Sequence, residues 1–383
     1  MKFAIDAHAI GQKLTGNETY IRNLLKGFAT LDSDSEFLAL VSADDAVSHI
    51  PKGFHVQRVS TNPYVRLGWQ LASRVTQWKP DLLHVQYTAP LHCSVPTVVS
   101  VHDVSYLESP EFFSRYRATQ LKITVKRTVQ QAAHIVTPSE FSRQAVAQWY
   151  GLDPERITVV HNAVDETFRP GSRESSAAWL LRHQDVAWPY VLTVGDLQPR
   201  KNHIGLIRAF ESVMRENPQL THRLVITGKD TWFSADVRAA AKASSVADRI
   251  VFTGFVNDDE LHHYYSGCDI FVYPSFYEGF GLPILEAMAC GRAVACSDTS
   301  AMPEVADSAA LLFDPKQRGQ IARAMRDLLI DPELRSRMER LGSQRAALFS
   351  WERASRRTLD VYYSVADRRH QGAKVRSVSA ARR

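Results

Sequence analysis

The chain has 383 residues, of which 45% are hydrophobic and 23% are charged, and its formal net charge at pH 7 is +5. This length predicts two domains of roughly 150–200 residues, and the composition predicts large cores and excludes a disordered chain. Residues 368–383 hold six Arg and Lys and no acid, which leaves −1 for the other 367 residues. Because the positive charge is confined to one end, it argues against a nucleic-acid partner. It indicates a solvated, disordered tail or a tail attracted to an anionic membrane surface.

The cysteines and the N-terminus both bear on location. The four cysteines form no metal-type Cys-x-x-Cys pair and are too few for a disulfide framework, which predicts a reducing compartment. The first residues, "MKFAIDAHAIG", have no signal-peptide core, and no apolar run reaches about 18 residues. We therefore expect a cytoplasmic protein that could contact the inner membrane face peripherally.

Short apolar runs alternate with helical patterns along the first half of the chain. Amphipathic segments such as 17–31 and 116–132 separate the runs. The runs that predict buried parallel strands are 2–7, 36–42, 82–87, 97–103, 134–139 and 157–164. This alternation predicts a doubly wound sheet.

The pattern breaks at 166–188, where "ETFRPGSRESS" is rich in Pro, Gly, Ser and charge and predicts a linker. It then restarts. Strands are expected at 190–197, 223–229, 250–256, 269–275, 293–298 and 309–315, and helices at 320–329, 332–347 and 351–367. The sequence thus predicts an α/β fold with Rossmann-like domains at 1–170 and 186–350 and a disordered tail at 368–383. Ligands of such sheets bind at the carboxyl ends of the strands, here in a cleft between two domains.

The segment "VGDLQPRKNH", residues 194–203, places two cations at that edge. It follows an expected strand and precedes a helical pattern, so Arg200 and Lys201 lie at a helix N-terminus. Two cations and the positive end of a helix suit a diphosphate. An exposed basic helix start is the alternative.

The segment "YPSFYEGFGLPILEAMACG", residues 273–291, holds two carboxylates. Glu278 is expected in a turn, and Glu286 about one turn inside a helix that begins at Pro283. Gly279 and Gly281 would let backbone N–H groups approach an anion. Carboxylates at two depths of one pocket suit the hydroxyls of two sugars better than acid–base chemistry. The alternative is a charge near the helix N-terminus and an exposed helix residue.

The stretch "EGFGLPILE" resembles the Glu-x7-Glu motif of the retaining family 4 glycosyltransferases, which have the GT-B fold of two Rossmann-like domains facing each other across a cleft. Other segments are similar to family segments in the same order, and the likeness covers nearly the whole chain. They are "IDAHAIGQKLTGNETYIRNLL", "VVSVHDV", "IVTPSEFSR", "ITVVHNAVD", "GDLQPRKN", "RIVFTGFVNDDELHHYY" and "SAMPEVADSAALLFDP". The resemblance implies that the helix at about 352–367 packs back on the first domain.

The resemblance implies roles on both sides of the cleft. Arg200 and Lys201 would neutralise the donor diphosphate. Glu278 would contact the transferred sugar, and Glu286 would bind the nucleotide ribose. His102, which follows a strand of the first domain, would contact the transferred sugar or the reaction centre. A buried histidine satisfied by its neighbours is the alternative for His102.

Further contacts implied by the resemblance involve smaller or apolar residues. Gly16 lies in an N-terminal loop near the phosphates, although "TGNETY" lacks the second glycine and the arginine of many relatives, which weakens a side-chain contact there. Val256 and Leu261 would pack near the base. The backbone amides that would contact sugar or phosphate are those of Gly279, Phe280, Gly281 and Leu282.

No acidic cluster has the pattern of a divalent-metal site. The stretch "DSD" at 32–34 matches the Asp-x-Asp motif of the other glycosyltransferase fold, but it is expected at the far end of the sheet, as a polar turn. Scattered histidines such as His134 and His161 do not form a ligand set. We therefore expect catalysis without a metal or cofactor.

The resemblance implies a retaining hexosyltransferase of cell-surface polysaccharide synthesis, with a glycan or lipid-linked acceptor. The N-terminal pattern most resembles bacterial polysaccharide mannosyltransferases, so GDP-mannose is the first choice of donor. A UDP-hexose (glucosyl, galactosyl or N-acetylglucosaminyl) is the second. A nucleotide-sugar epimerase of the same fold and a non-catalytic glycan-binding protein stay open. The basic helix expected at 115–131 could meet a membrane or a diphosphate-lipid, or it could be a solvated face.

Overall fold

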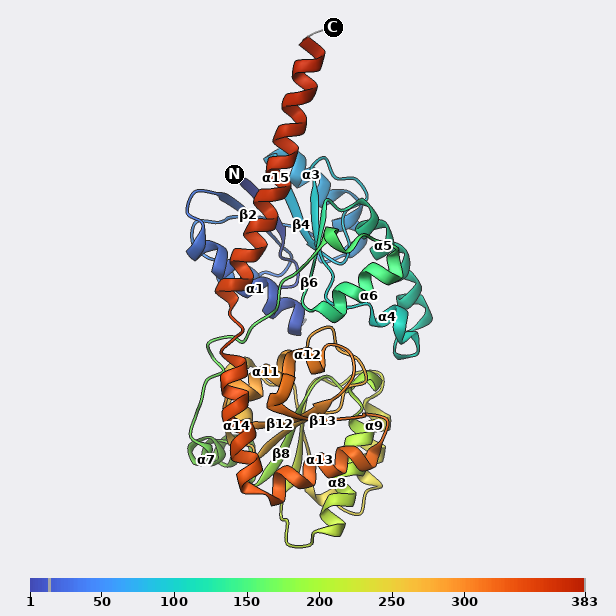
Figure 1. Ribbon diagram of the computed structural model, residues 1–383, viewed down its shortest axis with the longest axis vertical. Helices are drawn as coiled ribbons and strands as arrows, with labels where there is room; N and C mark the ends of the chain where they lie inside the picture. Colours follow the sequence, from blue (N-terminus) through green and yellow to red (C-terminus); the bar gives the residue numbers. More distant parts are fainter. Residues whose placement is uncertain (13–14, 382–383) are drawn as a thin grey trace. The chain divides into compact units, whose positions relative to one another are not determined.

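The computed structural model describes residues 1–12 and 15–381 and divides into two compact units (Figure 1). The first unit comprises Met1–Asn162 and Ser350–Arg383, and the second comprises Ala163–Phe349. The chain therefore builds most of the first unit, then the whole second unit, and returns to the first. The linker predicted at 166–188 is not irregular throughout, because it contains helix α7, Arg173–Gln184, which belongs to the second unit.

Within residues 1–12 and 15–162, seven strands form one parallel sheet in the order β3-β2-β1-β4-β5-β6-β7. The strands are β1 Lys2–Asp6, β2 Glu36–Val41, β3 His55–Arg58, β4 Leu82–Gln86, β5 Thr97–Ser100, β6 His134–Thr137 and β7 Ile157–Val159. The sequence does not predict β3, because "HVQR" carries little apolar signal. As an edge strand, β3 buries less of its surface than the central strands do.

Helices cover both faces of this sheet. They are α1 Thr15–Leu31, α2 Pro63–Val65, α3 Leu71–Trp78, α4 Ser105–Glu108, α5 Arg115–Gln131, α6 Glu140–Tyr150 and α15 Trp351–Ala381, with a π-helical turn η2 at Arg66–Gln70. Helices α1 and α15 pack on one face, where Phe28 and Tyr362 share a core with Phe3 (Figure 1). Helices α3, α5 and α6 contribute to the core on the other face.

Helix α15 continues past residue 368 to Ala381, and the disordered tail from residue 368 stays a prediction. The basic composition argued for disorder, but the segment holds no proline to end the helix. Its first turn is also anchored: Arg369 Nη1 donates to the carbonyl oxygens of Pro80 and Asp81 at 2.8 and 2.9 Å. Helix α15 is therefore longer than its apolar pattern indicates.

The second unit, residues 163–349, holds a six-stranded parallel sheet in the order β10-β9-β8-β11-β12-β13. The strands are β8 Tyr190–Val194, β9 Arg223–Thr227, β10 Ile250–Gly254, β11 Ile270–Tyr273, β12 Ala293–Ser297 and β13 Ala310–Phe313. Each lies in a predicted apolar run. The central strands β11 and β12 are buried along their whole length, as expected for a parallel sheet covered on both faces.

Helices again form two layers around this sheet. Besides α7 they are α8 His203–Glu216, α9 Ser234–Lys242, α10 Asp258–Gly267, α11 Leu282–Ala289, α12 Met302–Ala306, α13 Arg318–Ile330 and α14 Pro332–Ala346. Helices α8, α9 and α13 share one core, and α7, α10, α11 and α12 share the other. Across the described part of the chain, no helix is both long enough and apolar enough to cross a bilayer.

Parallel strands give each sheet one edge at which all the carboxyl ends meet. In the first sheet, the loops after β1, β4 and β5 start at this edge, and in the second sheet the loops after β8, β9 and β11 do. Side chains in these loops are thus brought together although they are far apart in sequence. The α/β fold with two doubly wound sheets is the predicted one.

Candidate functional site

The loop after β8 positions Arg200 and Lys201. Both lie in a single 3-10 turn, Pro199–Lys201, and Asn202 ends this turn in the left-handed conformation at φ 54° before α8 begins. The stem of Lys201 crosses Gly195, where an added Cβ would come within 3.1 Å of the lysine Cδ and Cε. A larger residue at 195 would therefore displace the lysine, so this glycine helps to aim the ammonium group.

One carboxylate oxygen holds both cations. Oε1 of Glu278 lies 2.7 Å from Nη1 of Arg200 and 2.7 Å from Nζ of Lys201. Lys201 also donates to the Tyr273 hydroxyl at 2.6 Å, and Arg200 donates to the Tyr277 carbonyl at 2.6 Å. Two cations thus share one carboxylate oxygen where the loops after β8 and β11 meet. Such a cluster suits a ligand with several negative charges.

Burial and the two cations act in opposite directions on the pKa of Glu278. Burial of the carboxyl group raises the pKa, but Arg200 and Lys201 outweigh it and bring the pKa to about 2. Burial lowers the pKa of the Lys201 ammonium group, and the charge of Glu278 opposes this shift. Glu278 is therefore ionised at neutral pH and has no proton to donate, which argues against a role as general acid.

The glycine turn after Glu278 presents backbone rather than side chains. Gly281 caps α11 with φ 105°, in the region that favours glycine. Gly279 is buried, and Leu282 is half-buried in the first turn of α11. The Phe280 ring lies in the core, with its centroid 5.8 Å from that of Phe349. Phe280 can therefore serve a ligand only through its backbone, as the resemblance implied.

Glu286 lies on α11 in a different environment from that of Glu278. Its Oε2 accepts a hydrogen bond from the Tyr265 hydroxyl at 2.7 Å, and burial raises its pKa to about 7. Leu261 is part of the same hydrophobic core as Tyr265, and Val256 packs against that core. The structure thus gives the two carboxylates different partners, cations for one and a tyrosine for the other.

In the first unit, His102 follows β5. Its Nε2 lies 2.9 Å from Oε1 of Gln86, and its ring packs edge-on against Tyr20 with centroids 4.6 Å apart. Burial lowers its pKa to about 4, so the imidazole is neutral at pH 7. With Nε2 donating to the glutamine, Nδ1 is the acceptor of the ring. The neighbouring Asp103 instead caps its own turn by accepting from the backbone N–H of Ser105 at 2.9 Å.

A charged group that the sequence patterns did not single out lies at the end of β1. Buried Asp6 has Oδ1 3.0 Å from Nδ1 of His8 and Oδ2 3.8 Å from Nε of Arg66, at the start of the π-helical turn. Burial raises the pKa of Asp6, but His8 and Arg66 reverse this effect and lower the pKa. The sequence signal that could have identified this group is an acidic residue, Asp6, in the last position of an apolar strand. This group shares the carboxyl-end edge of the first sheet with His102.

Gly16 requires a correction. It lies exposed in the first turn of α1 and not in a loop. In the preceding loop, Gly11 has the left-handed conformation at φ 77°, and its N–H donates to Oε1 of Glu18 at 3.0 Å. The glycine that shapes this loop is therefore Gly11. Residues 13–14 lie outside the described residues.

The described residues contain no group of three or more His, Cys, Asp or Glu that could hold a metal ion. The Asp-x-Asp stretch at 32–34 is a turn just before β2, in which Asp32 Oδ1 accepts from the N–H groups of Asp34 and Ser35 at 3.2 and 3.1 Å. It lies at the amino ends of the strands, away from the His102 edge. Catalysis without a metal stays a prediction.

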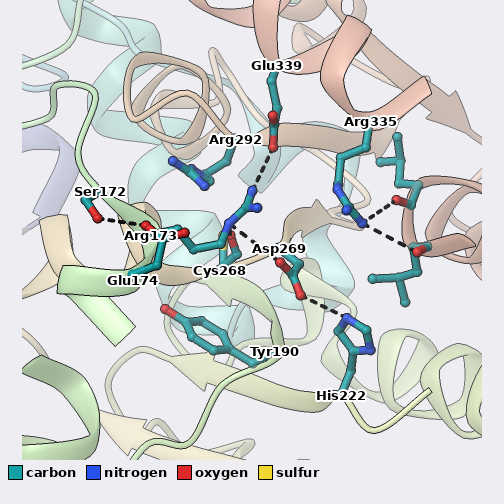
Figure 2. A network of polar contacts seen from close by, with 12 residues as sticks. Ser172, Arg173, Glu174, Tyr190, His222, Cys268, Asp269, Arg292, Arg335 and Glu339 are labelled. Atoms are coloured by element: carbon teal, nitrogen blue, oxygen red, sulfur yellow. Dashed lines mark hydrogen bonds and ion pairs between the residues drawn. The ribbon is translucent and has the colours of Figure 1, made fainter. Parts of the chain in front are cut away.

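A second charge network lies at the amino ends of the second sheet (Figure 2). Asp269, just before β11, has Oδ1 3.6 Å from Nε of Arg173 and Oδ2 3.0 Å from Nε2 of His222. Nη2 of Arg173 lies 2.8 Å from Oε1 of Glu339. The network ties α7 and α14 to the sheet, at the edge opposite Glu278. It therefore belongs to the framework rather than to the site.

Two family descriptions match the chain. Residues 184–345 match "Glycosyl transferases group 1", and residues 14–168 match "Glycosyltransferase Family 4". The chain is 32% identical over 266 residues to O-antigen chain mannosyltransferase B of Escherichia coli, an alignment that covers 69% of each protein. It is 29% identical to D-inositol 3-phosphate glycosyltransferase of Streptomyces bingchenggensis, over 77% of this chain and 63% of that protein. It is 28% identical to the serotype-specific mannosyltransferase WbdA of Escherichia coli, over 71% of this chain and 35% of WbdA.

Solved structures share the fold at low sequence identity. Sucrose-phosphate synthase from Thermosynechococcus elongatus has a TM-score of 0.76 and 19% identity, over 95% of this chain and 99% of that one. Anabaena HepE in complex with UDP-glucose has a TM-score of 0.76 and 21% identity, over 95% of this chain and 100% of that one. The predicted family and fold are thus confirmed. The chain belongs to the group 1 and family 4 glycosyltransferases and has their GT-B fold.

Proposed function

We propose that this chain is a retaining hexosyltransferase that moves mannose from GDP-mannose to a glycan or lipid-linked acceptor in the synthesis of a cell-surface polysaccharide. The observation that carries the proposal is the convergence of Arg200 and Lys201 on Glu278 beside the glycine turn. Relatives named as mannosyltransferases favour mannose. A UDP-hexose is the second candidate donor, since a structural neighbour was crystallised with UDP-glucose.

In this proposal the donor diphosphate binds Arg200 and Lys201 in competition with Glu278. The bond between the anomeric carbon and the β-phosphate oxygen breaks, and its electron pair stays on that oxygen. The two cations and the amides of the glycine turn stabilise the charge that develops there. In comparable sites, one preorganised hydrogen-bonding group that stabilises such a charge lowers the activation barrier by about 2.7–4 kcal/mol.

The acceptor hydroxyl then bonds to the anomeric carbon on the face that the phosphate leaves, and a phosphate oxygen takes the hydroxyl proton. This route keeps the anomeric configuration. Glu278, being ionised, accepts hydrogen bonds from the transferred sugar, and neutral His102 keeps its implied role as a contact of that sugar. No side chain needs to act as general acid, in keeping with the low pKa of Glu278.

Glu286 holds the nucleotide ribose in this proposal. Its carboxylate can accept hydrogen bonds from two vicinal hydroxyls, while Val256 and Leu261 pack near the base. The enzyme would need no resident metal or cofactor. It would work in the cytoplasm with peripheral contact to the inner membrane face.

Nucleotide binding tests the proposal directly. We expect GDP and GDP-mannose to raise the melting temperature of the full chain more than UDP and UDP-glucose do, with the same response in EDTA. NMR of the product should show that the anomeric configuration of the donor is kept. A larger response to UDP would move the donor class to UDP-hexoses. If no nucleotide raised the melting temperature, this would contradict the proposal that the chain is a glycosyltransferase.

A further inference from the structure

Large apolar side chains are exposed together on the first unit. Their exposed fractions are 66% for Tyr64, 63% for Trp69, 59% for Leu91, 67% for Tyr116 and 64% for Ile123. Single exposed apolar residues are ordinary on a protein surface, but a contiguous group usually marks an interaction site. These five residues are called the aromatic face.

Hydrogen bonds bring the segments of the aromatic face together. The hydroxyls of Tyr64, in α2, and Tyr116, in α5, are 2.6 Å apart. The N–H of Leu91, in the loop after β4, donates to the carbonyl of Leu67 at 3.0 Å. Leu67 lies in the same π-helical turn as Trp69. The five side chains therefore come from adjoining segments and not from scattered places.

Helix α5, labelled in Figure 1, contributes Tyr116 and Ile123 to the aromatic face. Tyr116 and Ile123 are seven residues apart, which is two helical turns, so they point the same way. The opposite side of the helix is buried through Val125 and Val129. Tyr116 and Ile123 are thus not spare core positions, since α5 already contributes its own residues to the core.

Helix α5 is also strongly basic. It contains Arg115, Arg117, Lys122, Lys126 and Arg127 and no acid. Lys122 and Lys126 are exposed, and both lie within one helical turn of Ile123. A solvated basic helix would not need large apolar residues on its exposed side. Tyr and Trp rings beside Lys and Arg are the composition of surfaces that lie in the boundary between water and an anionic bilayer.

We propose that the aromatic face, with Lys122 and Lys126, docks the first unit on an anionic lipid bilayer. Leu91 and Ile123 enter the outer part of the acyl layer, and the rings of Trp69 and the two tyrosines lie at headgroup level. The lysines contact lipid phosphates. This docking needs neither donor binding nor transfer, so it can be tested without turnover and stands or falls independently of the proposed reaction.

Vesicle flotation of the full chain tests the docking. We expect binding to vesicles of phosphatidylcholine mixed with phosphatidylglycerol, little binding to phosphatidylcholine alone, and loss of binding at high salt. Because each lysine near an anionic surface contributes about 1 kcal/mol, the pair Lys122→Gln and Lys126→Gln should weaken binding about 30-fold. Ile123→Ser should weaken it about tenfold, since one apolar side chain is removed from the acyl layer.

Matched controls come from the second unit. Ile330, 48% exposed, and the exposed Lys242 and Lys316 provide Ile330→Ser and the pair Lys242→Gln and Lys316→Gln. These controls should float like the wild type, and every variant should keep the wild-type melting temperature. The proposal is overturned if the wild type does not float with anionic vesicles. It is also overturned if the α5 variants float as well as the controls, or if Ile123→Ser instead dissociates a dimer.

Discussion

The two edges of the second sheet both carry charges, but the charges are arranged differently. At the carboxyl ends of the strands, Arg200 and Lys201 share one oxygen of Glu278. At the amino ends, Asp269 offers one oxygen to Arg173 and the other to a histidine (Figure 2). The first arrangement places two cations on one oxygen, whereas the second gives each oxygen of Asp269 one partner. Two like charges held side by side cost stability when no ligand is bound, so they indicate a binding site, whereas a paired network indicates a framework.

Among the variants that test this comparison, Lys201→Ala should reduce the rate of sugar transfer the most. We expect transfer to fall about 10²–10³-fold, because one charge that stabilises the leaving phosphate is lost. The fold should persist, since Arg200 still neutralises Glu278. The measurement is the rate of product formation at saturating donor, with the melting temperature recorded beside it. Turnover near that of the wild type would remove Lys201 from the site.

Glu278→Gln provides the matched contrast within the same cluster. Removing the charge of Glu278 raises the net positive charge around Arg200 and Lys201. The variant should therefore bind the bare nucleoside diphosphate more tightly, while the rate of transfer falls. Isothermal titration gives the affinity. Equal weakening of diphosphate binding by both variants would show that the cluster does not act through its charge.

Arg173→Ala changes the network at the amino ends of the second sheet, and it should lower stability while leaving turnover unchanged. Asp269 and Glu339 would lose their shared counter-charge in a partly buried setting, so the free energy of unfolding should fall by about 2–3 kcal/mol. Turnover at a temperature well below melting should stay near the wild-type value. Denaturant unfolding measures the loss.

Arg356→Ala is the control, because its ion pair with Glu352 is exposed and should contribute less than about 1 kcal/mol. A loss of turnover in Arg173→Ala without a loss of stability would give the framework network a functional role instead.

Glu286→Gln should change how stability depends on pH, whatever it does to donor binding. The folded pKa of Glu286 is about 7 against an ordinary 4.5, so between these values the folded state keeps a proton that the unfolded state has released. The free energy of unfolding of the wild type therefore falls as pH rises through this window. Relative to the wild type, the variant should gain about 3 kcal/mol between pH 4 and pH 8, since the pKa of Glu286 is raised from 4.5 to about 7. Parallel pH profiles for the two proteins would rule out the raised pKa.

The apolar runs predicted the strands well because central strands of a parallel sheet are buried on both faces. All six strands of the second sheet lie in predicted runs, whereas the edge strand β3 does not. The first turn of the predicted tail shows a related limit of the sequence patterns. Composition reports the average charge of a segment but not the anchoring of its first turn, which Arg369 provides.

For the candidate site, too, one part could be predicted from the sequence and another part could not. The residue types of Arg200, Lys201, Glu278 and Glu286, and their positions after strands, could be predicted from sequence. Their partners could not. Tyr265, which bonds Glu286, lies on a helix that begins between two other strands, and no spacing rule joins it to the motif.

The sequence is enough to predict two parallel sheets and the loops in which the charged residues lie, because burial and turn chemistry act locally along the chain. Contacts in the folded chain keep Glu278 ionised between two cations and give Glu286 a raised pKa beside a tyrosine. They also bring Asp6, His8 and Arg66 together at the end of β1 and place aromatic residues from separate segments on one exposed face. Desolvation and charge pairing depend on neighbours in space, and the order of strands in a sheet sets those neighbours.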